Sequence, residues 1–239
     1  MKSLHDRLSF LLKKAIRDYR LIDDGDKVLV ALSGGKDSLC LLQLLAERQR
    51  IFMPKFTLEA VHVRMRNIPY ESDTSYLENF ASELGVRLHV VETAFEQRPG
   101  SKKPACFLCS WYRRKELFRL AQEGGFNKIA LGHHQDDMVR TALMNLTFHG
   151  QFATMPARLT MKKMPLTIIR PLCLMQEEDI RRFSTDNNYQ KQKKLCPHER
   201  ETNRTEIGSL VDMMERLNSD AKKSVWNSLE RAGLLTEES

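Results

Sequence analysis

Apolar residues along this chain alternate between two patterns. Short, nearly continuous apolar runs, typical of buried strands, occur at 27–32, 56–63, 87–92, 128–131 and 167–170. Longer segments with helical spacing lie between them, beginning after residue 38 and at 72–84, 110–123, 136–148 and 176–188. Because strands alternate with helices, the pattern predicts an α/β fold: a Rossmann-like, doubly wound parallel sheet with helices on both faces and right-handed crossovers.

Helical patterns also flank this alternating region. Residues 4–19 carry leucines and an isoleucine at helical spacing between basic residues, which predicts an amphipathic N-terminal helix. A polar, mostly basic connector at 189–204 leads to helical segments at 205–217 and 221–229. We expect an N-terminal helix within 1–25, a main domain at 26–188, and a C-terminal part at 189–239 packed on the same domain.

A glycine-containing loop follows the first predicted strand. Its sequence is Ser33-Gly34-Gly35-Lys36-Asp37-Ser38. A strand, a turn with two glycines and a helix start bring backbone N–H groups, hydroxyls and the positive end of a helix dipole around one concavity, which suits a phosphate. The spacing differs from both the ordinary P-loop and the dinucleotide-binding G-x-G-x-x-G. Since ligands of doubly wound sheets bind at the carboxyl ends of strands, this loop is the first candidate site.

Composition narrows the class of protein and of partner. The 239 residues are 41% hydrophobic and carry a net charge of +7, which favours a polyanionic partner such as nucleic acid. No apolar run approaches the roughly 18 residues that span a bilayer, and the charged N-terminus lacks the apolar core of a signal peptide. We expect a cytoplasmic protein with no membrane contact.

Cysteine spacing suggests metal or sulfur chemistry. Five cysteines are an odd number in a chain without an export signal, so a disulfide framework is not expected. Cys106 and Cys109 form a C-x-x-C pair, and Cys196 is the third candidate ligand. Three cysteines with one open position suit a [4Fe–4S] cluster. A zinc site completed by His198 or Glu199 is an alternative, and a redox dithiol is a weaker one.

A second polar loop follows the strand at 128–131. It reads Leu131-Gly132-His133-His134-Gln-Asp136-Asp137 and leads into a predicted helix. Histidines and aspartates at such a junction can hold Mg²⁺ or contact a nucleotide. Capping of the following helix by one of the aspartates explains the pattern equally well.

Together these segments carry a resemblance to a known family. The SGGKDS loop, the cysteine pair, the Gly132–Asp137 loop and the runs at 155–158 and 169–172 occur in the order seen in tRNA 2-thiocytidine synthetases of the TtcA family. These are PP-loop ATP-pyrophosphatases, and the likeness extends from the N-terminal helix to about Cys196. It implies that 26–188 has the PP-loop fold of the adenine nucleotide alpha hydrolase type.

The resemblance implies an ATP-dependent tRNA sulfurtransferase. ATP would adenylate O2 of a cytidine in the tRNA anticodon loop, and sulfur presented by a [4Fe–4S] cluster would displace AMP, giving 2-thiocytidine. A cysteine desulfurase or hydrosulfide would supply the sulfur, and a homodimer is a possible assembly. Asp37 would act through Mg²⁺, Arg113 and Asp137 would steady the nucleotide and the adenylation transition state, and Cys106, Cys109 and Cys196 would hold the cluster. The implied ATP-binding residues are Ser33, Gly34, Gly35, Lys36, Asp37, Ser38 and Gly132.

Basic residues gain a role under this interpretation. They are expected on either side of the site, contacting phosphates of a folded RNA; they are Lys102, Lys103, Arg114, Lys115, Lys162, Lys163, Lys193 and Lys194. A base splayed out of an anticodon loop could stack on Phe107, Trp111 or Tyr112. Packing of these aromatics into the core beneath the helix is the alternative.

One segment departs from the family pattern. Family members usually carry a second C-x-x-C in the late loop, whereas this chain reads Cys196-Pro-His-Glu199. Three cysteines still permit a cluster, but the modified nucleotide stays open. Uridine thiolation, lysidine formation and a non-catalytic, zinc-containing RNA-binding protein are therefore kept as alternatives.

Overall fold

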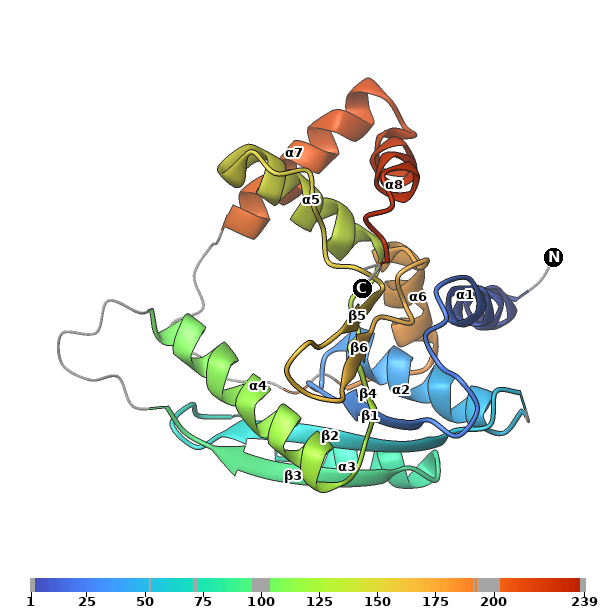
Figure 1. The fold of residues 1–239 in the computed structure, drawn as a ribbon, viewed down its shortest axis with the longest axis vertical. Coiled ribbons are helices and arrows are strands. Elements are labelled where there is room, and N and C mark those ends of the chain that lie inside the picture. Colours follow the sequence, from blue (N-terminus) through green and yellow to red (C-terminus); the bar gives the residue numbers. More distant parts are fainter. Residues whose placement is uncertain are drawn as a thin grey trace.

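The computed structural model describes residues 3–51, 53–70, 73–95, 104–190, 192 and 203–236, without side chains for 203–205. Its centre is one six-stranded sheet in the order β3-β2-β1-β4-β6-β5 (Figure 1). The strands are β1 (Lys27–Ala31), β2 (Thr57–Met65), β3 (Arg87–Thr93), β4 (Lys128–Ala130), β5 (Arg158–Thr160) and β6 (Thr167–Ile169). All neighbours pair in parallel except β5 with β6. The predicted doubly wound α/β fold is confirmed.

The antiparallel edge strand β5 is absent from the sequence-based expectation of a wholly parallel sheet. It has three residues, with Arg158 and Leu159 half-buried and Thr160 exposed, so it lacks the continuous apolar run that marks the buried strands. Its pairing with β6 depends on the short connection through residues 161–166. Mixed sheets with one antiparallel edge strand are common in doubly wound folds.

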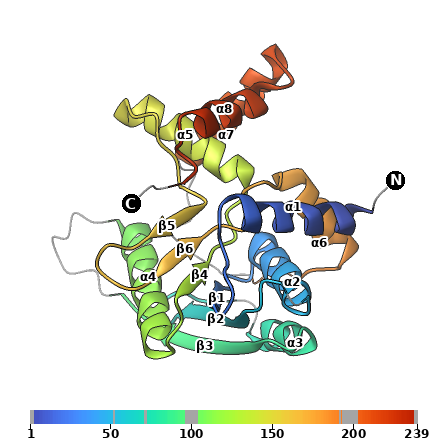
Figure 2. The same ribbon diagram turned by 45° about the vertical axis from the view of Figure 1, so that its right-hand side comes forward.

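Helices cover both faces of the sheet. One face carries α2 (Lys36–Gln49) and α3 (Ser75–Glu83), while α1 (Leu4–Asp18) and α6 (Glu177–Asp186) pack against α2 (Figure 2). The other face carries α4 (Ala105–Glu123). The larger apolar core lies on the α2 side, and a smaller one, which includes Leu29, Val61, Leu117 and Ala121, lies under α4.

The remaining helices stand together beyond the sheet. These are α5 (Gln135–His149), α7 (Asn203–Leu217) and α8 (Ala221–Arg231), and α7 and α8 both pack against α5 (Figure 1). This confirms the C-terminal helical extension, while the domain boundaries at 25 and 188 stay a prediction. No helix in the described part of the chain is both long and apolar enough to cross a bilayer.

Helix α4 begins five residues earlier than predicted. Pro104 occupies the N-cap position, and the helix includes Cys106 and Cys109 in its opening turns. Proline is well tolerated at a helix start because its missing N–H would be unpaired there. The cysteine pair therefore lies at a helix N-terminus instead of in the loop expected before it.

The strand order reverses between β1 and β4, which are paired neighbours at the centre of the sheet. A ligand crevice is expected outside the carboxyl ends of the strands at such a reversal. The SGGKDS loop follows β1 there, and the Gly132–Asp137 loop follows β4. The two loops singled out from the sequence are therefore neighbours in space.

Candidate ATP and sulfur-transfer site

The loop after β1 has the geometry of an anion-binding turn. Gly34 adopts a left-handed φ of +83°, and Gly35 is the N-cap of α2. The Ser38 hydroxyl donates to the Gly35 carbonyl at 2.9 Å, and the Ser33 N–H donates to Ser38 Oγ at 3.1 Å. In the described part of the chain, no side chain caps the N-terminal N–H groups of α2. Such groups, at the positive end of the helix dipole, are suited to phosphate.

Gly132 holds the first turn of α2 in place from the neighbouring loop. A Cβ at this position would lie 3.1 Å from both the Asp37 carbonyl carbon and the Ser38 nitrogen, and 3.2 Å from the Asp37 oxygen. A side chain here would push the two loops apart by a few tenths of an ångström, so glycine suits this close approach. Its contact is thus with the backbone of the phosphate loop.

A cavity of about 520 Å³ opens beside these loops. Ser33 and Gly35 line it from the loop after β1, His133 from the loop after β4, and Ser110 and Arg113 from α4. A volume of this size suits a nucleotide or a comparable small molecule. The cavity therefore joins the candidate phosphate site to the turn of α4 that directly follows Cys109.

Two carboxylates from the two loops meet at a buried histidine. His134 is 2% exposed, and its Nε2 lies 3.7 Å from Asp37 Oδ1 and 3.5 Å from Asp137 Oδ2. Asp137 also accepts a hydrogen bond from the backbone N–H of His134 at 3.2 Å, so it caps α5. This confirms the capping role that the sequence suggested for one of the two aspartates. Mg²⁺ is commonly held by one or two carboxylates plus phosphate oxygens. Asp37 and Asp137 fit that requirement, although no group of three potential metal-ligating side chains is found among the described residues.

Lys36 is held by carboxylates on both sides. Its Nζ lies 2.9 Å from Asp37 Oδ1 and 3.2 Å from Glu177 Oε1, while Arg140 Nη1 lies 3.0 Å from Glu177 Oε2. Burial alone would lower the pKa of Lys36, but these two carboxylates outweigh it and leave that pKa above its usual value. Lys36 is thus a cation at neutral pH, placed at the phosphate loop.

A second ion pair links the site to the C-terminal helices. Asp136, 5% exposed, accepts the backbone N–H of Glu177 at 2.7 Å and the Lys222 ammonium at 3.1 Å. Burial favours a raised pKa for Asp136, yet these two donors prevail and hold that pKa below its usual range. Lys222 belongs to α8, so the C-terminal extension contributes directly to the packing behind the site.

Arg113 is oriented by Tyr70, which follows β2. Its Nη2 donates to the Tyr70 hydroxyl at 2.9 Å, and the guanidinium of Arg64 lies 4.9 Å from the centre of the Tyr70 ring. Tyr70 and Arg113 both line the cavity. The geometry therefore places a cation on the wall of the cavity.

The connector that carries the third cysteine touches the phosphate loop. Gln192 donates its backbone N–H to the Gly34 carbonyl at 2.9 Å, and a Cβ on Gly34 would lie 2.4 Å from Gln192 Cβ. Gln192 also lines the cavity. Cys196 itself lies outside the described residues, as do His198 and Glu199.

Comparison with known proteins agrees with this architecture. A family model of the PP-loop domain matches residues 4–206. The chain belongs to the PP-loop family. Its relatives include a tRNA-cytidine(32) 2-sulfurtransferase of Pseudomonas putida, 34% identical over 232 residues that cover 95% of this chain and 84% of that protein. One of the same name from Bdellovibrio bacteriovorus is 40% identical over 176 residues, 72% of this chain and 67% of that protein.

Among solved structures, the U34-tRNA thiolase NcsA from Methanococcus maripaludis, determined with its [4Fe-4S] cluster, superposes with a TM-score of 0.75. It is 25% identical and the match covers 96% of this chain and 78% of that chain. Within the PP-loop family, the sequence relatives group this protein with the tRNA-cytidine(32) 2-sulfurtransferases.

The cysteine pair of this PP-loop protein is accessible. Cys106 is exposed and Cys109 is half-buried. At a spacing of three in a helix, their side chains lie on neighbouring positions of one face. The pair can therefore supply two ligands to one metal centre from the N-terminal turns of α4.

The predicted RNA-contacting residues of the PP-loop protein separate into three groups. Arg114 and Lys115 are exposed on α4, and Arg114 also lines the cavity. Lys162 and Lys163 lie in the connection before β6, at the amino edge of the sheet, whereas the phosphate loop lies at its carboxyl edge. They do not flank the site as expected, because a connection that precedes a parallel strand lies at the opposite edge. Contact with tRNA by the described residues stays a prediction; Lys102, Lys103, Lys193 and Lys194 lie outside them.

Proposed function

We propose that the protein is an ATP-dependent tRNA sulfurtransferase that converts a cytidine of the tRNA anticodon loop to 2-thiocytidine. The observation that carries the proposal is the shared cavity: the phosphate loop forms one side, and the turn of α4 that follows the cysteine pair forms another. The names of the relatives and of the thiolase neighbour support the same chemistry.

The phosphate loop binds ATP in this proposal. Amides at the start of α2 hold the phosphates together with Ser33, Lys36 and Ser38. Asp37 and Asp137 hold Mg²⁺ against phosphate oxygens, which is the coordination that Mg²⁺ prefers. Gly34 and Gly35 form the turn, and Gly132 fixes its distance from the neighbouring loop.

Adenylation turns a poor leaving oxygen into AMP. O2 of the cytidine attacks the α-phosphorus and pyrophosphate leaves, after which a sulfur nucleophile attacks C2 and AMP leaves. Arg113 neutralises charge that develops on the transferring phosphorus centre, a role that its place on the cavity wall permits. Tyr70 holds the guanidinium in that position through its hydroxyl.

The cysteine pair of α4 fits an iron–sulfur cluster for which we propose Cys196 as the third protein ligand. Cys106 and Cys109 share one face of α4, and Gln192 lies at the cavity wall only four residues before Cys196. Four residues of chain span at most about 14 Å, so Cys196 is within reach of the same region. When bound, a [4Fe–4S] cluster with three protein ligands offers an iron that can carry the sulfur to be transferred.

Mass spectrometry of nucleosides from bulk tRNA of cells with and without the gene tests the function. Loss of 2-thiocytidine from the deleted strain, restored by the intact gene and not by a D37A variant, is the expected result. The thiolase neighbour makes a thiouridine the second candidate. Loss of a thiouridine instead would reassign the base, while an unchanged nucleoside profile would overturn the sulfurtransferase.

Iron and sulfide analysis tests the cysteine site independently. Protein purified without oxygen is expected to lose most of its iron in the Cys106→Ser and Cys196→Ser variants while remaining folded. The buried Cys173, whose pKa is raised to about 12 mainly by burial, provides the matched control, Cys173→Ala. Wild-type iron and sulfide in both serine variants would exclude the cluster assignment.

A further inference from the structure

The exposed face of α4 carries an aromatic and basic stripe that the proposed chemistry does not use. Phe107 and Trp111 are 45% and 47% exposed, which is unusual for side chains of this size. Lys115 follows at the same spacing of four, so the three side chains lie on one helix face. We name Phe107, Trp111 and Lys115 the α4 stripe.

The rings and the charge of the stripe are arranged together. The Lys115 ammonium lies 5.8 Å from the centre of the Trp111 ring, and Tyr112 meets the same ring edge-to-face at 4.9 Å between centroids. Lys115 and Tyr112 therefore pack beside the indole ring of Trp111. Nearly half of its surface stays open to solvent, and a planar base can stack on it with its phosphate near the lysine.

Charge identifies the chemical class of the partner. Residues 105–115 contain no acidic side chain, and Arg113, Arg114 and Lys115 follow one another within them. Aromatic rings beside cations on one face are the combination that binds single-stranded nucleic acid. An apolar protein surface would leave the exposed Arg114 and Lys115 without complementary charge, so the features of this face favour RNA.

Position relates the stripe to the site. Phe107 lies between the two cysteines in sequence, and Arg114, next to Lys115, lines the cavity. A nucleotide stacked on Trp111 would thus lie within one or two helical turns of both the cysteine pair and the cavity.

We propose that the α4 stripe is a stacking platform for an unpaired base of the RNA substrate, adjacent to the base that enters the cavity. The proposal rests on the proposed function for the identity of the RNA, and it assigns to Trp111 the binding of a flanking nucleotide. Trp111 acts in substrate binding and has no part in adenylation.

Tryptophan fluorescence gives a direct test with the intact protein. The chain has two tryptophans, and the other, Trp226, is 5% exposed in α8. Titration with anticodon stem-loop RNA is expected to quench the emission, and the quench should disappear in the Trp111→Phe variant while RNA affinity is largely kept. Trp111→Ala should weaken binding about tenfold, which corresponds to about 1.4 kcal/mol.

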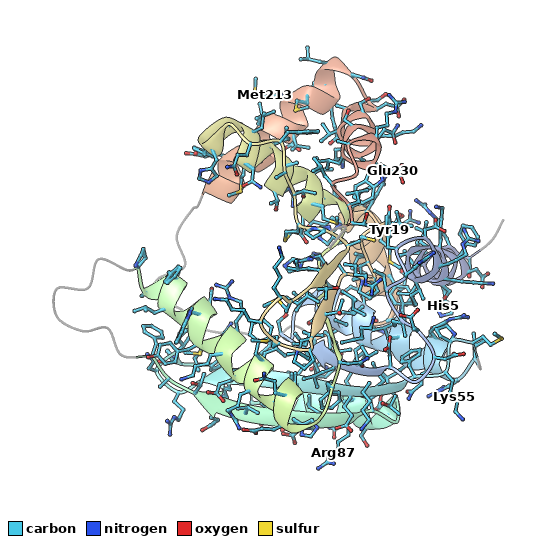
Figure 3. All side chains as sticks on the ribbon, in the orientation of Figure 1. His5, Tyr19, Lys55, Arg87, Met213 and Glu230 are labelled. Atoms are coloured by element: carbon cyan, nitrogen blue, oxygen red, sulfur yellow. The ribbon has the colours of Figure 1, made fainter. Side chains whose placement is uncertain are left out.

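A matched control separates stacking from general loss of apolar surface. Met213 is 59% exposed on α7, well away from α4 (Figure 3), and Met213→Ala should leave RNA affinity unchanged. In the thiolation assay, Trp111→Ala should raise the KM for tRNA about tenfold, leave the KM for ATP unchanged and keep the iron content. Lys115→Met should reduce the slope of log affinity against log salt by about 1.

The outcomes distinguish the inference from the function. Thiolation with wild-type tRNA affinity in Trp111→Ala would overturn the platform and leave the sulfurtransferase standing. RNA quenching that depends on Trp111 without any thiolation would support the platform and overturn the function. A change in oligomeric state in Trp111→Ala, with RNA affinity unchanged, would show that the face binds a second copy and would overturn the inference.

Discussion

Substituting Gly132 by alanine tests how the phosphate loop is held. The new methyl group would lie 3.1 Å from the Asp37 carbonyl carbon and the Ser38 nitrogen. These atoms belong to the backbone of the first turn of α2, so no flexible side chain can move away to relieve the contact. A separation of that size requires a shift of a few tenths of an ångström, and overpacking of this kind costs about 1–3 kcal/mol.

That shift falls on the amides proposed to bind phosphate. We expect the Gly132→Ala variant to bind a non-hydrolysable ATP analogue about tenfold more weakly, or about 1.4 kcal/mol, by titration calorimetry. Its melting temperature should fall by about 2–4 °C for each kcal/mol of overpacking in a chain of this length. The variant should still fold, since only one contact between two loops is strained.

The matched control is Gly208→Ala in α7. No atom of the described residues lies within 4 Å of a Cβ built there, and alanine is favoured over glycine by about 1 kcal/mol in a helix interior. This variant should bind the analogue as the wild type does and melt at the same temperature or higher. Wild-type ATP affinity in Gly132→Ala would refute the argument, because the loop would then tolerate the displacement or would not bind phosphate.

Three further changes probe the groups around the cavity. Tyr70→Phe removes a hydrogen bond to Arg113 that is worth about 1 kcal/mol. We expect kcat to fall about fivefold with little change in the KM for ATP. An unchanged kcat would contradict the positioning role of Tyr70. Lys222→Met removes a cation that lowers the pKa of Asp136. A lowered carboxyl pKa stabilises the folded state above about pH 4, and this stabilisation is lost as the pH falls. The midpoint of acid unfolding, followed by circular dichroism, should therefore move to higher pH in the variant, and an unchanged midpoint would exclude the coupling. Gly34→Ala places a side chain in the left-handed region against the cysteine connector, so iron content and ATP affinity should fall together, and loss of only one would show that the two are independent.

The parts of the fold predicted from sequence depend on local patterns. The strand, glycine turn and helix around Ser33–Ser38 lie within one short segment, so apolar periodicity and turn chemistry were sufficient to place them. The doubly wound order then followed from alternation and crossover handedness. The early start of α4 escaped detection because Cys106 and Phe107 are exposed, so the first turn lacks an apolar stripe.

The groups that orient the site could not be predicted in this way. Glu177 meets Lys36 across 141 positions of sequence, and Lys222 meets Asp136 across 86. Each of these residues is an ordinary charged side chain in a helix, for which a solvated surface position is the usual expectation. Their role becomes apparent only when α2 meets α6 and α5 meets α8.

Three remote segments hold three different parts of the phosphate loop. Gly132 packs against its helix start, Glu177 pairs with Lys36, and Gln192 donates its backbone N–H to the Gly34 carbonyl. Only the last of these segments also carries a candidate cluster ligand. A phosphate group that shifts the turn at Gly34 would therefore act directly on Gln192, the residue that hydrogen-bonds to this turn four positions before Cys196.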